Sequence, residues 1–251
     1  MFTGERPRRP FDGRVALVTG AGGAVERAIA EQLGAAGAAV AVVAQSPARV
    51  DATVAAVRGA GGEADGFIAD LSDPESVPAL VQGVGQVFGE VDILVNHAAT
   101  VAPLGGVSAL EPAAVLHAFT VNVASVVVLA GAVIPPMLDR GWGRIVNVCG
   151  SVGDLVSWPG GNIYAACVAA VEAHTVNLAA ELAGTGITVN ALRAQRPGTA
   201  LQRWLGGVDP EAVDDPLIRR FIVSVTEQGT GEFAVPLVDH LVTAQTGRIW
   251  S

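Results

Sequence analysis

The residues best suited to chemistry in this chain are Ser151 and Tyr164, which follow a short apolar run at residues 145–148. A hydroxyl and a phenol can both donate hydrogen bonds to a carbonyl oxygen, and the phenol can also exchange a proton with it. A free phenol has a pKa of about 10, so this exchange is poor near neutral pH unless a cation lies close by. Four positions after Tyr164, on the same face of the expected helix, the chain has Val168, which supplies no charge.

The elements that must position these residues alternate along the chain. Short apolar runs suited to buried parallel strands are separated by longer stretches with helical patterning. This alternation predicts right-handed βαβ units and therefore an α/β fold, a Rossmann-like doubly wound parallel sheet in a single domain at residues 11–251, after a flexible tail at 1–10. Strands are expected at residues 14–19, 40–44, 66–69, 91–95, 145–148 and 187–192, and helices at 25–36, 47–59, 74–88, 111–138, 164–183, 216–225 and 232–243.

These features together resemble the short-chain dehydrogenase/reductase (SDR) family. That family places a serine at this strand end and a Y-x-x-x-K sequence on the next helix; Ser151 and Tyr164 match, and Val168 replaces the lysine. The resemblance covers nearly the whole chain. It implies a nicotinamide cofactor, NAD(P), and catalytic roles for Ser151, Tyr164 and Asn122, the last as the residue that holds a proton-relay water. A structural role for Asn122 in a helix kink is equally compatible with the sequence.

Residues 19–26 occupy the place of the family's T-G-x-x-x-G-x-G loop, whose backbone amides bind a pyrophosphate at a helix N-terminus. Gly20 and Gly22 are glycines as expected, but Ala24 and Glu26 replace the second and third glycines of the motif. A carboxylate in contact with the anionic ligand would cost about 4 kcal/mol. The alternative is that Glu26 turns outward and only complements the helix dipole.

The remaining cofactor positions implied by the resemblance are partly changed. Asp70 and Asn96 match the family residues beside the adenine and in the sheet, although an acid after a strand is also an ordinary turn residue. Gln45, at the end of the second strand, carries no charge that would choose between NAD and NADP. Ala194 and Gln195 replace a proline and a glycine that shape the nicotinamide pocket in the family.

Other reactive residues lie near these motifs. His97 could be a general acid or base, although a lone histidine at a strand end is more often structural. Cys149 and Cys167 have no evident base or cation to activate them, which favours a place in the core. Arg193 and Arg196 could bind an anionic substrate or pair with Glu26, or they could be solvated. No metal site is expected.

Composition narrows the classes of partner. The net charge of −9 disfavours nucleic acid and anionic membranes. All fifteen basic residues are arginines, so no lysine elsewhere can replace the missing one. Two cysteines predict no disulfide framework, and neither a signal peptide nor an uninterrupted membrane-length apolar run is found, so a cytoplasmic location is expected.

We therefore expect an SDR-like protein with impaired NAD(P) binding and hydride transfer, and no bound cofactor. One role is an inactive (pseudoenzyme) subunit that associates with itself or with an active SDR homologue through helices 111–138 and 164–183. Another is a cofactor-independent catalyst in which Ser151 and Tyr164 hydrogen-bond a small carbonyl compound. The alternative is an NAD(P)-dependent oxidoreductase that interconverts a ketone and a secondary alcohol.

Overall fold

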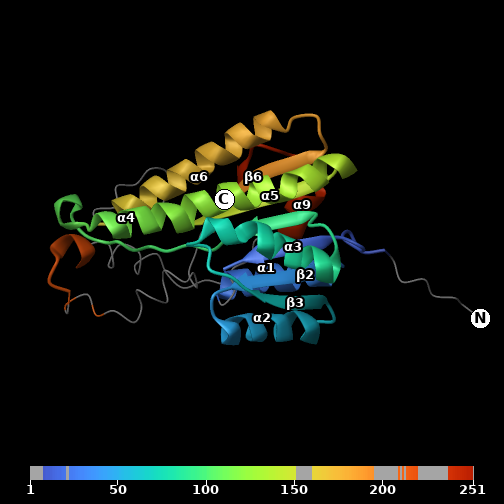
Figure 1. Ribbon diagram of the computed structural model, residues 1–251, viewed down its shortest axis with the longest axis horizontal. Helices are drawn as coiled ribbons and strands as arrows, with labels where there is room; N and C mark the ends of the chain where they lie inside the picture. The colour runs from blue at the N-terminus through green and yellow to red at the C-terminus, as the bar shows by residue number, and fades with distance from the viewer. Residues whose placement is uncertain are drawn as a thin grey trace, which may run out of the picture.

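The strands form one parallel sheet in the computed structural model, which describes residues 8–20, 23–150, 160–194, 209, 211, 213–219 and 237–250. Within these residues the seven strands have the order β3-β2-β1-β4-β5-β6-β7, and each neighbouring pair is parallel. In Figure 1, β2 and β3 lie towards the bottom and β6 towards the top. The strands are β1 (Val15–Thr19), β2 (Ala39–Ala44), β3 (Glu63–Ile68), β4 (Ile93–Asn96), β5 (Gly143–Gly150), β6 (Ile187–Ala194) and β7 (Ile249–Trp250).

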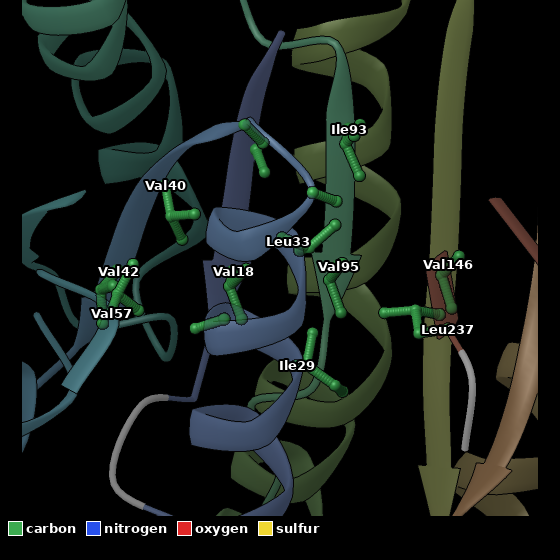
Figure 2. Close-up of a cluster of buried hydrophobic side chains, with 14 of the residues drawn as sticks. Val18, Ile29, Leu33, Val40, Val42, Val57, Ile93, Val95, Val146 and Leu237 are labelled. Carbon is green, nitrogen blue, oxygen red and sulfur yellow. The ribbon is translucent and has the colours of Figure 1, made fainter. Parts of the chain in front are cut away.

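Helices cover both faces of the sheet, which confirms the doubly wound α/β architecture. Alternate residues of β1 face opposite layers: Ala16 and Val18 pack in a core cluster with α1, α2 and α9, whereas Val15 and Leu17 pack in a cluster with α3, α5 and α6. Figure 2 shows the first cluster, with side chains from α1 against β1 and β4. The helices are α1 (Ala24–Ala35), α2 (Pro47–Gly59), α3 (Val77–Phe88), α4 (Pro112–Phe119), α5 (Ser125–Arg140), α6 (Asn162–Glu181) and α9 (Leu237–Val242).

Several boundaries differ from those expected. The expected helix at 111–138 is divided into α4 and α5 by a π-helical turn, η3 (Thr120–Ala124), where the backbone is wound more loosely. Strand β3 begins at Glu63, before the expected range of 66–69. It is an edge strand whose outward positions carry exposed polar residues, so an apolar run does not mark its first residues in the sequence. Of the expected helices at 216–225 and 232–243, residues 216–219 and 237–242 are helical. The others, and residues 1–7 of the expected tail, lie outside the described residues.

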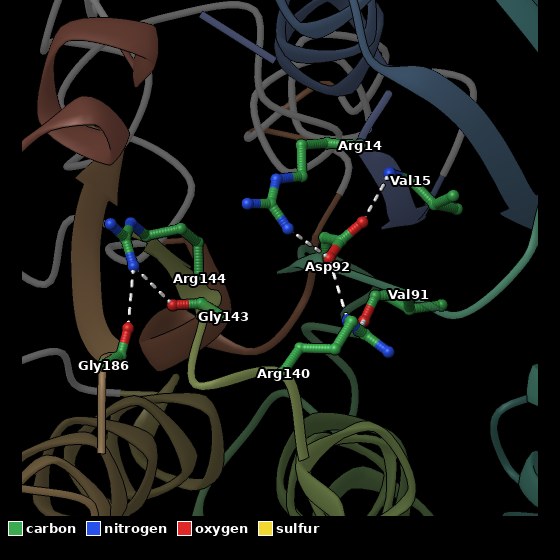
Figure 3. Close-up of polar contacts among 8 residues, drawn as sticks. All are labelled: Arg14, Val15, Val91, Asp92, Arg140, Gly143, Arg144 and Gly186. Atoms are coloured by element: carbon green, nitrogen blue, oxygen red, sulfur yellow. Dashed lines mark hydrogen bonds and ion pairs between the residues drawn. The ribbon is translucent and has the colours of Figure 1, made fainter. Parts of the chain in front are cut away.

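A polar cluster connects several elements at the amino-terminal ends of the strands (Figure 3). The buried carboxylate of Asp92 accepts hydrogen bonds from Arg14 Nη1 at 2.9 Å and from the Val15 amide at 3.1 Å, and Arg140 Nε lies 3.3 Å from it. Arg144 donates to backbone carbonyls at the ends of neighbouring elements. These contacts fix β1, β4 and α5 relative to one another, so that the carboxyl ends of the strands meet in a defined arrangement.

Candidate active site

The candidate site lies at the carboxyl ends of β1, β4 and β5, where the strand order reverses and open α/β sheets bind their ligands. Gly20 follows β1 with a φ of +89°, and a Cβ added there would lie 2.8 Å from the backbone nitrogen of Ala98. Thr19 Oγ1 accepts hydrogen bonds from the amides of His97 at 3.1 Å and Ala98 at 3.3 Å. A glycine is therefore required at position 20, because the loop after β1 packs directly on the end of β4.

Glu26 does not turn outward, which was one of the two orientations expected from the sequence. Its side chain is 3% exposed in the first turn of α1, and a Cβ added to Gly23 would collide with its carboxylate. Glu26 Oε1 lies 3.0 Å from Nδ1 of His97 at the end of β4. The carboxylate therefore bridges the cofactor loop and β4, and the outward orientation is wrong. His97 is accordingly part of a buried contact, not an isolated strand-end histidine.

Tyr164 lies in the first turn of α6, is 7% exposed, and has its hydroxyl close against Gly150, where an added Cβ would collide with it. Burial raises the pKa of Tyr164 well above its ordinary value, the nearby Cys149 raises it further, and a hydrogen bond to the Gly150 backbone partly opposes the shift. Near neutral pH the phenol consequently keeps its proton.

Val168 lies one helical turn beyond Tyr164 and packs in the same apolar cluster, together with Cys149 and Ala191. Its side chain is 9% exposed. In this cluster burial raises the pKa of Cys149 to about 12, and burial also raises the pKa of Cys167. Both thiols therefore stay protonated near neutral pH, which fits core residues better than nucleophiles.

Asn122 lies in the π-helical turn and is buried beside the loop that follows β4. Its Oδ1 accepts a hydrogen bond from the Thr100 amide, and its Nδ2 donates to the Thr100 carbonyl oxygen, each at 2.8 Å. The side chain therefore holds that loop in place. This contact with the loop differs from the helix-kink role considered from the sequence; that role and the relay of a proton through water both stay predictions.

Asn96 is buried at the end of β4 and donates from Nδ2 to Asn147 Oδ1 at 2.9 Å. Asn147, on β5, donates in turn to Thr175 Oγ1 of α6 at 2.9 Å. Asn96 Oδ1 has no hydrogen-bond partner among the described residues. This chain of side chains connects β4, β5 and α6 beneath the site, and sequence reasoning missed its two later members because they are polar residues inside apolar stretches.

Asp70 and Gln45 meet at the ends of β3 and β2. Gln45 Nε2 donates to Asp70 Oδ1 at 2.6 Å, and the Ser72 amide donates to the same oxygen at 2.8 Å. Hydrogen bonds from Ser72 chiefly, and from Gln45, lower the pKa of the Asp70 carboxyl, which is consequently ionised at neutral pH. Asp70 is both a turn residue and a charged group beside the candidate cofactor site.

Arg193 pairs with a residue that sequence reasoning missed. Its Nε and Nη2 lie 2.7 and 3.1 Å from the two carboxylate oxygens of Glu172 on α6. Glu172 continues the helix face that carries Tyr164 and Val168, which is the signal that could have identified it. The structure thus gives Arg193 a partner other than Glu26. Four expected positions, Ser151, Gly22, Gln195 and Arg196, lie outside the described residues, as do the side chains of Ala24 and Ala194.

The sequence and fold of this chain are similar to those of known proteins. A family model described as short chain dehydrogenase matches residues 14–203. The 3-oxoacyl-(acyl-carrier-protein) reductase FabG of Escherichia coli (strain K12) is 35% identical over 182 residues, 72% of this chain and 72% of that protein. NAD+-bound xylitol dehydrogenase superposes with a TM-score of 0.80 at 28% identity, covering 96% of this chain and 97% of that one. A variant of actinorhodin polyketide ketoreductase with NADPH gives 0.80 at 30% identity, covering 94% of each chain.

The expectation that this chain binds no cofactor is wrong, because similar proteins of known structure hold NAD+ or NADPH. Of the two orientations expected for Glu26, only the solvent-facing one is excluded, because its carboxylate is buried against Gly23 of the cofactor loop and His97. The main expectation of a non-redox protein is also not supported, and the alternative of an NAD(P)-dependent oxidoreductase fits these relatives better.

Proposed function

Because this chain belongs to the short-chain dehydrogenase/reductase family, we propose that it is an NAD(P)-dependent oxidoreductase that reduces a ketone to a secondary alcohol. The observation that carries the proposal is Tyr164, a buried phenol that stays protonated at the carboxyl end of β5. Two similar proteins are named as a reductase of a 3-oxoacyl group and as a ketoreductase, which supports carbonyl reduction as the reaction.

The residues at the carboxyl ends of β1 and β4 fit a bound dinucleotide. The loop after β1 turns at Gly20, which has a positive φ, and leads into the N-terminus of α1 at Ala24, where backbone amides can bind a phosphate. The buried Oδ1 of Asn96, without a partner among the described residues, is an acceptor left for a ligand or water. Gly20, Asp70 and Asn96 would hold the cofactor, whose nicotinamide supplies the hydride when bound.

Tyr164 performs the proton step of the proposed reduction. Its raised pKa keeps the proton on Oη near neutral pH, and a phenol readily gives that proton to an alkoxide, which is a much stronger base. Alcohol oxidation needs the phenolate instead, which burial disfavours and Val168 does not stabilise. We propose that this member has lost the lysine-assisted activation of its tyrosine. Ser151 is predicted to hydrogen-bond the carbonyl oxygen.

The proposal is tested with purified protein, a panel of ketones that includes a 3-oxoacyl thioester, and both reduced cofactors. Wild type should bind a cofactor and reduce at least one ketone, whereas Tyr164→Phe should bind the cofactor equally well and lose reduction. The reduction rate should be independent of Tyr164 ionisation up to a pH of about 10. If the cofactor binds and no ketone in the panel is reduced, the chain is a cofactor-binding subunit and the proposed reaction is wrong.

We further propose that the chain is cytoplasmic and self-associates through α4, α5 and α6. Large apolar side chains on these helices are exposed, including Leu116 at 69% and Val127 and Val176 at more than two fifths.

Two helical stretches, Pro112–Arg140 and Asn162–Glu181, are long and apolar enough to span a membrane, a test that the core helices of soluble proteins also pass. Sedimentation should show an oligomer that Leu116→Glu dissociates. A monomer at micromolar concentration would refute self-association, and an SDR homologue that co-purifies would indicate a mixed oligomer.

A further inference from the structure

We infer that the site selects NAD(H) over NADP(H), because the side chain that ends β2 is a glutamine bound to a carboxylate. The inference rests on the proposed function and refines it by naming the form of the cofactor. In dinucleotide-binding folds the residue at this strand end meets the 2′ position of the adenosine ribose, where NAD has a hydroxyl and NADP a phosphate.

The sheet brings Gln45 and Asp70 together. Strands β2 and β3 pair in parallel up to Ala44 and Ile68, so the residues that follow both strands share one edge. Gln45 Nε2 lies 2.6 Å from Asp70 Oδ1, and the Ser72 amide holds the same carboxylate at 2.8 Å. A negative charge is therefore fixed beside the residue that meets the ribose.

No basic side chain of these loops offsets that charge. Residues 19–26 contain no arginine, and residues 44–49 contain only Arg49, which is exposed on α2. Arg27, in the first turns of α1, lies 3.3 Å from Glu31. Asp70 contacts Gln45, and α1 carries the buried Glu26 in its first turn. The electrostatic field at this edge is consequently unfavourable to a second phosphate.

The hydrogen-bonding groups favour the same choice. A ribose hydroxyl can both donate and accept, whereas a phosphate ester at neutral pH only accepts and carries a charge of about −1.5 to −2. Gln45 already directs a donor towards Asp70, which leaves its Oε1 as an acceptor for the hydroxyl proton. Both side chains are exposed, so solvent and salt screen the repulsion. We expect NADH to bind about tenfold more tightly than NADPH, equivalent to about 1.4 kcal/mol.

Equilibrium binding of NADH and NADPH to the whole chain, followed by cofactor fluorescence or calorimetry, tests the inference without any substrate. Wild type should prefer NADH about tenfold. Gln45→Arg should reverse or abolish the preference, and Asp70→Asn should reduce it by improving NADPH binding. Arg49→Ala is the matched control and should leave the ratio unchanged, because Arg49 is not the residue that meets the ribose.

The outcomes separate the two proposals. If neither cofactor binds, the proposed function fails. If both bind and NADPH is equal or tighter, the cofactor preference is wrong while the proposed function stands. If Gln45→Arg leaves the ratio unchanged in a variant with the wild-type melting temperature, Gln45 does not set the preference. If a Gln45 or Asp70 variant fails to fold, the ratio measured for wild type alone decides.

Discussion

Replacing Val168 by lysine should lower the pKa of Tyr164 and, if the proposed activity holds, allow alcohol oxidation at a lower pH. The two residues are four positions apart on one face of α6, so their Cβ atoms are about 5–6 Å apart. An ammonium about 5 Å from the phenolate, at an effective dielectric constant near 20, stabilises it by about 3 kcal/mol. That energy corresponds to a decrease of about two units in the pKa of the phenol.

The assay exploits the fact that the chain has a single tyrosine. Tyrosinate absorbance in the near ultraviolet therefore reports Tyr164 alone, with Tyr164→Phe as the blank. The folded wild type should titrate at a higher pH than the unfolded chain, for which the pKa is about 10. Val168→Lys should titrate about two units below wild type. Val168→Met, unbranched but uncharged, is the control for the change in shape and should titrate like wild type.

The raised pKa of Tyr164 also predicts that the folded protein becomes less stable at high pH. Burial favours the neutral phenol in the folded state, so above a pH of about 10 the unfolded chain loses its proton first and the free energy of unfolding decreases, by up to about 1.4 kcal/mol per pH unit. Cys149, whose pKa burial raises to about 12, contributes in the same sense. The contribution of Tyr164 to this pH dependence is therefore the difference in the free energy of unfolding between wild type and Tyr164→Phe.

Two results would contradict this account. A wild-type titration at or below the unfolded value would mean that a group near Tyr164 stabilises the phenolate, and the proposed loss of activation would be wrong. A Val168→Lys variant that folds but titrates like Val168→Met would mean that the ammonium turns away from the phenol. In that case the helical spacing alone does not place position 168 against the hydroxyl.

Three further changes test contacts around the site. Asp92→Asn should lower the free energy of unfolding in urea by about 2 kcal/mol, because two arginines and the Val15 amide lose a buried carboxylate. The control, Asp65→Asn at an exposed position, should lower it by less than about 0.5 kcal/mol, and equal decreases for the two variants would contradict this prediction. Glu26→Gln and His97→Asn should be non-additive by about 1 kcal/mol in a double-mutant cycle, whereas additive effects would deny the contact. Asn122→Ala should cost about 2 kcal/mol, since it removes both hydrogen bonds to Thr100; an unchanged urea midpoint would argue against the structural role.

The fold and the location of the site followed from local patterns in the sequence. Apolar runs such as residues 14–19 arise because both faces of the inner strands are buried, so they identify these strands of a parallel sheet without reference to the rest of the chain. Their alternation with helices predicts a doubly wound parallel sheet, in which the carboxyl ends of the strands lie on one side. The sequence alone therefore assigns Gly20, Asn96 and Tyr164 to one edge of the sheet.

The orientation and partner of each charged side chain were decided only by the tertiary structure. Glu26 could have faced solvent, but it is buried, with its Oε1 3.0 Å from Nδ1 of His97 at the end of a strand distant in the sequence. Arg193 likewise pairs with Glu172 on α6, and Gln45 hydrogen-bonds Asp70, which follows the neighbouring parallel strand. Sequence periodicity records which face of an element is buried, but hydrogen bonds and ion pairs depend on atoms that chain folding brings within about 3 Å of one another.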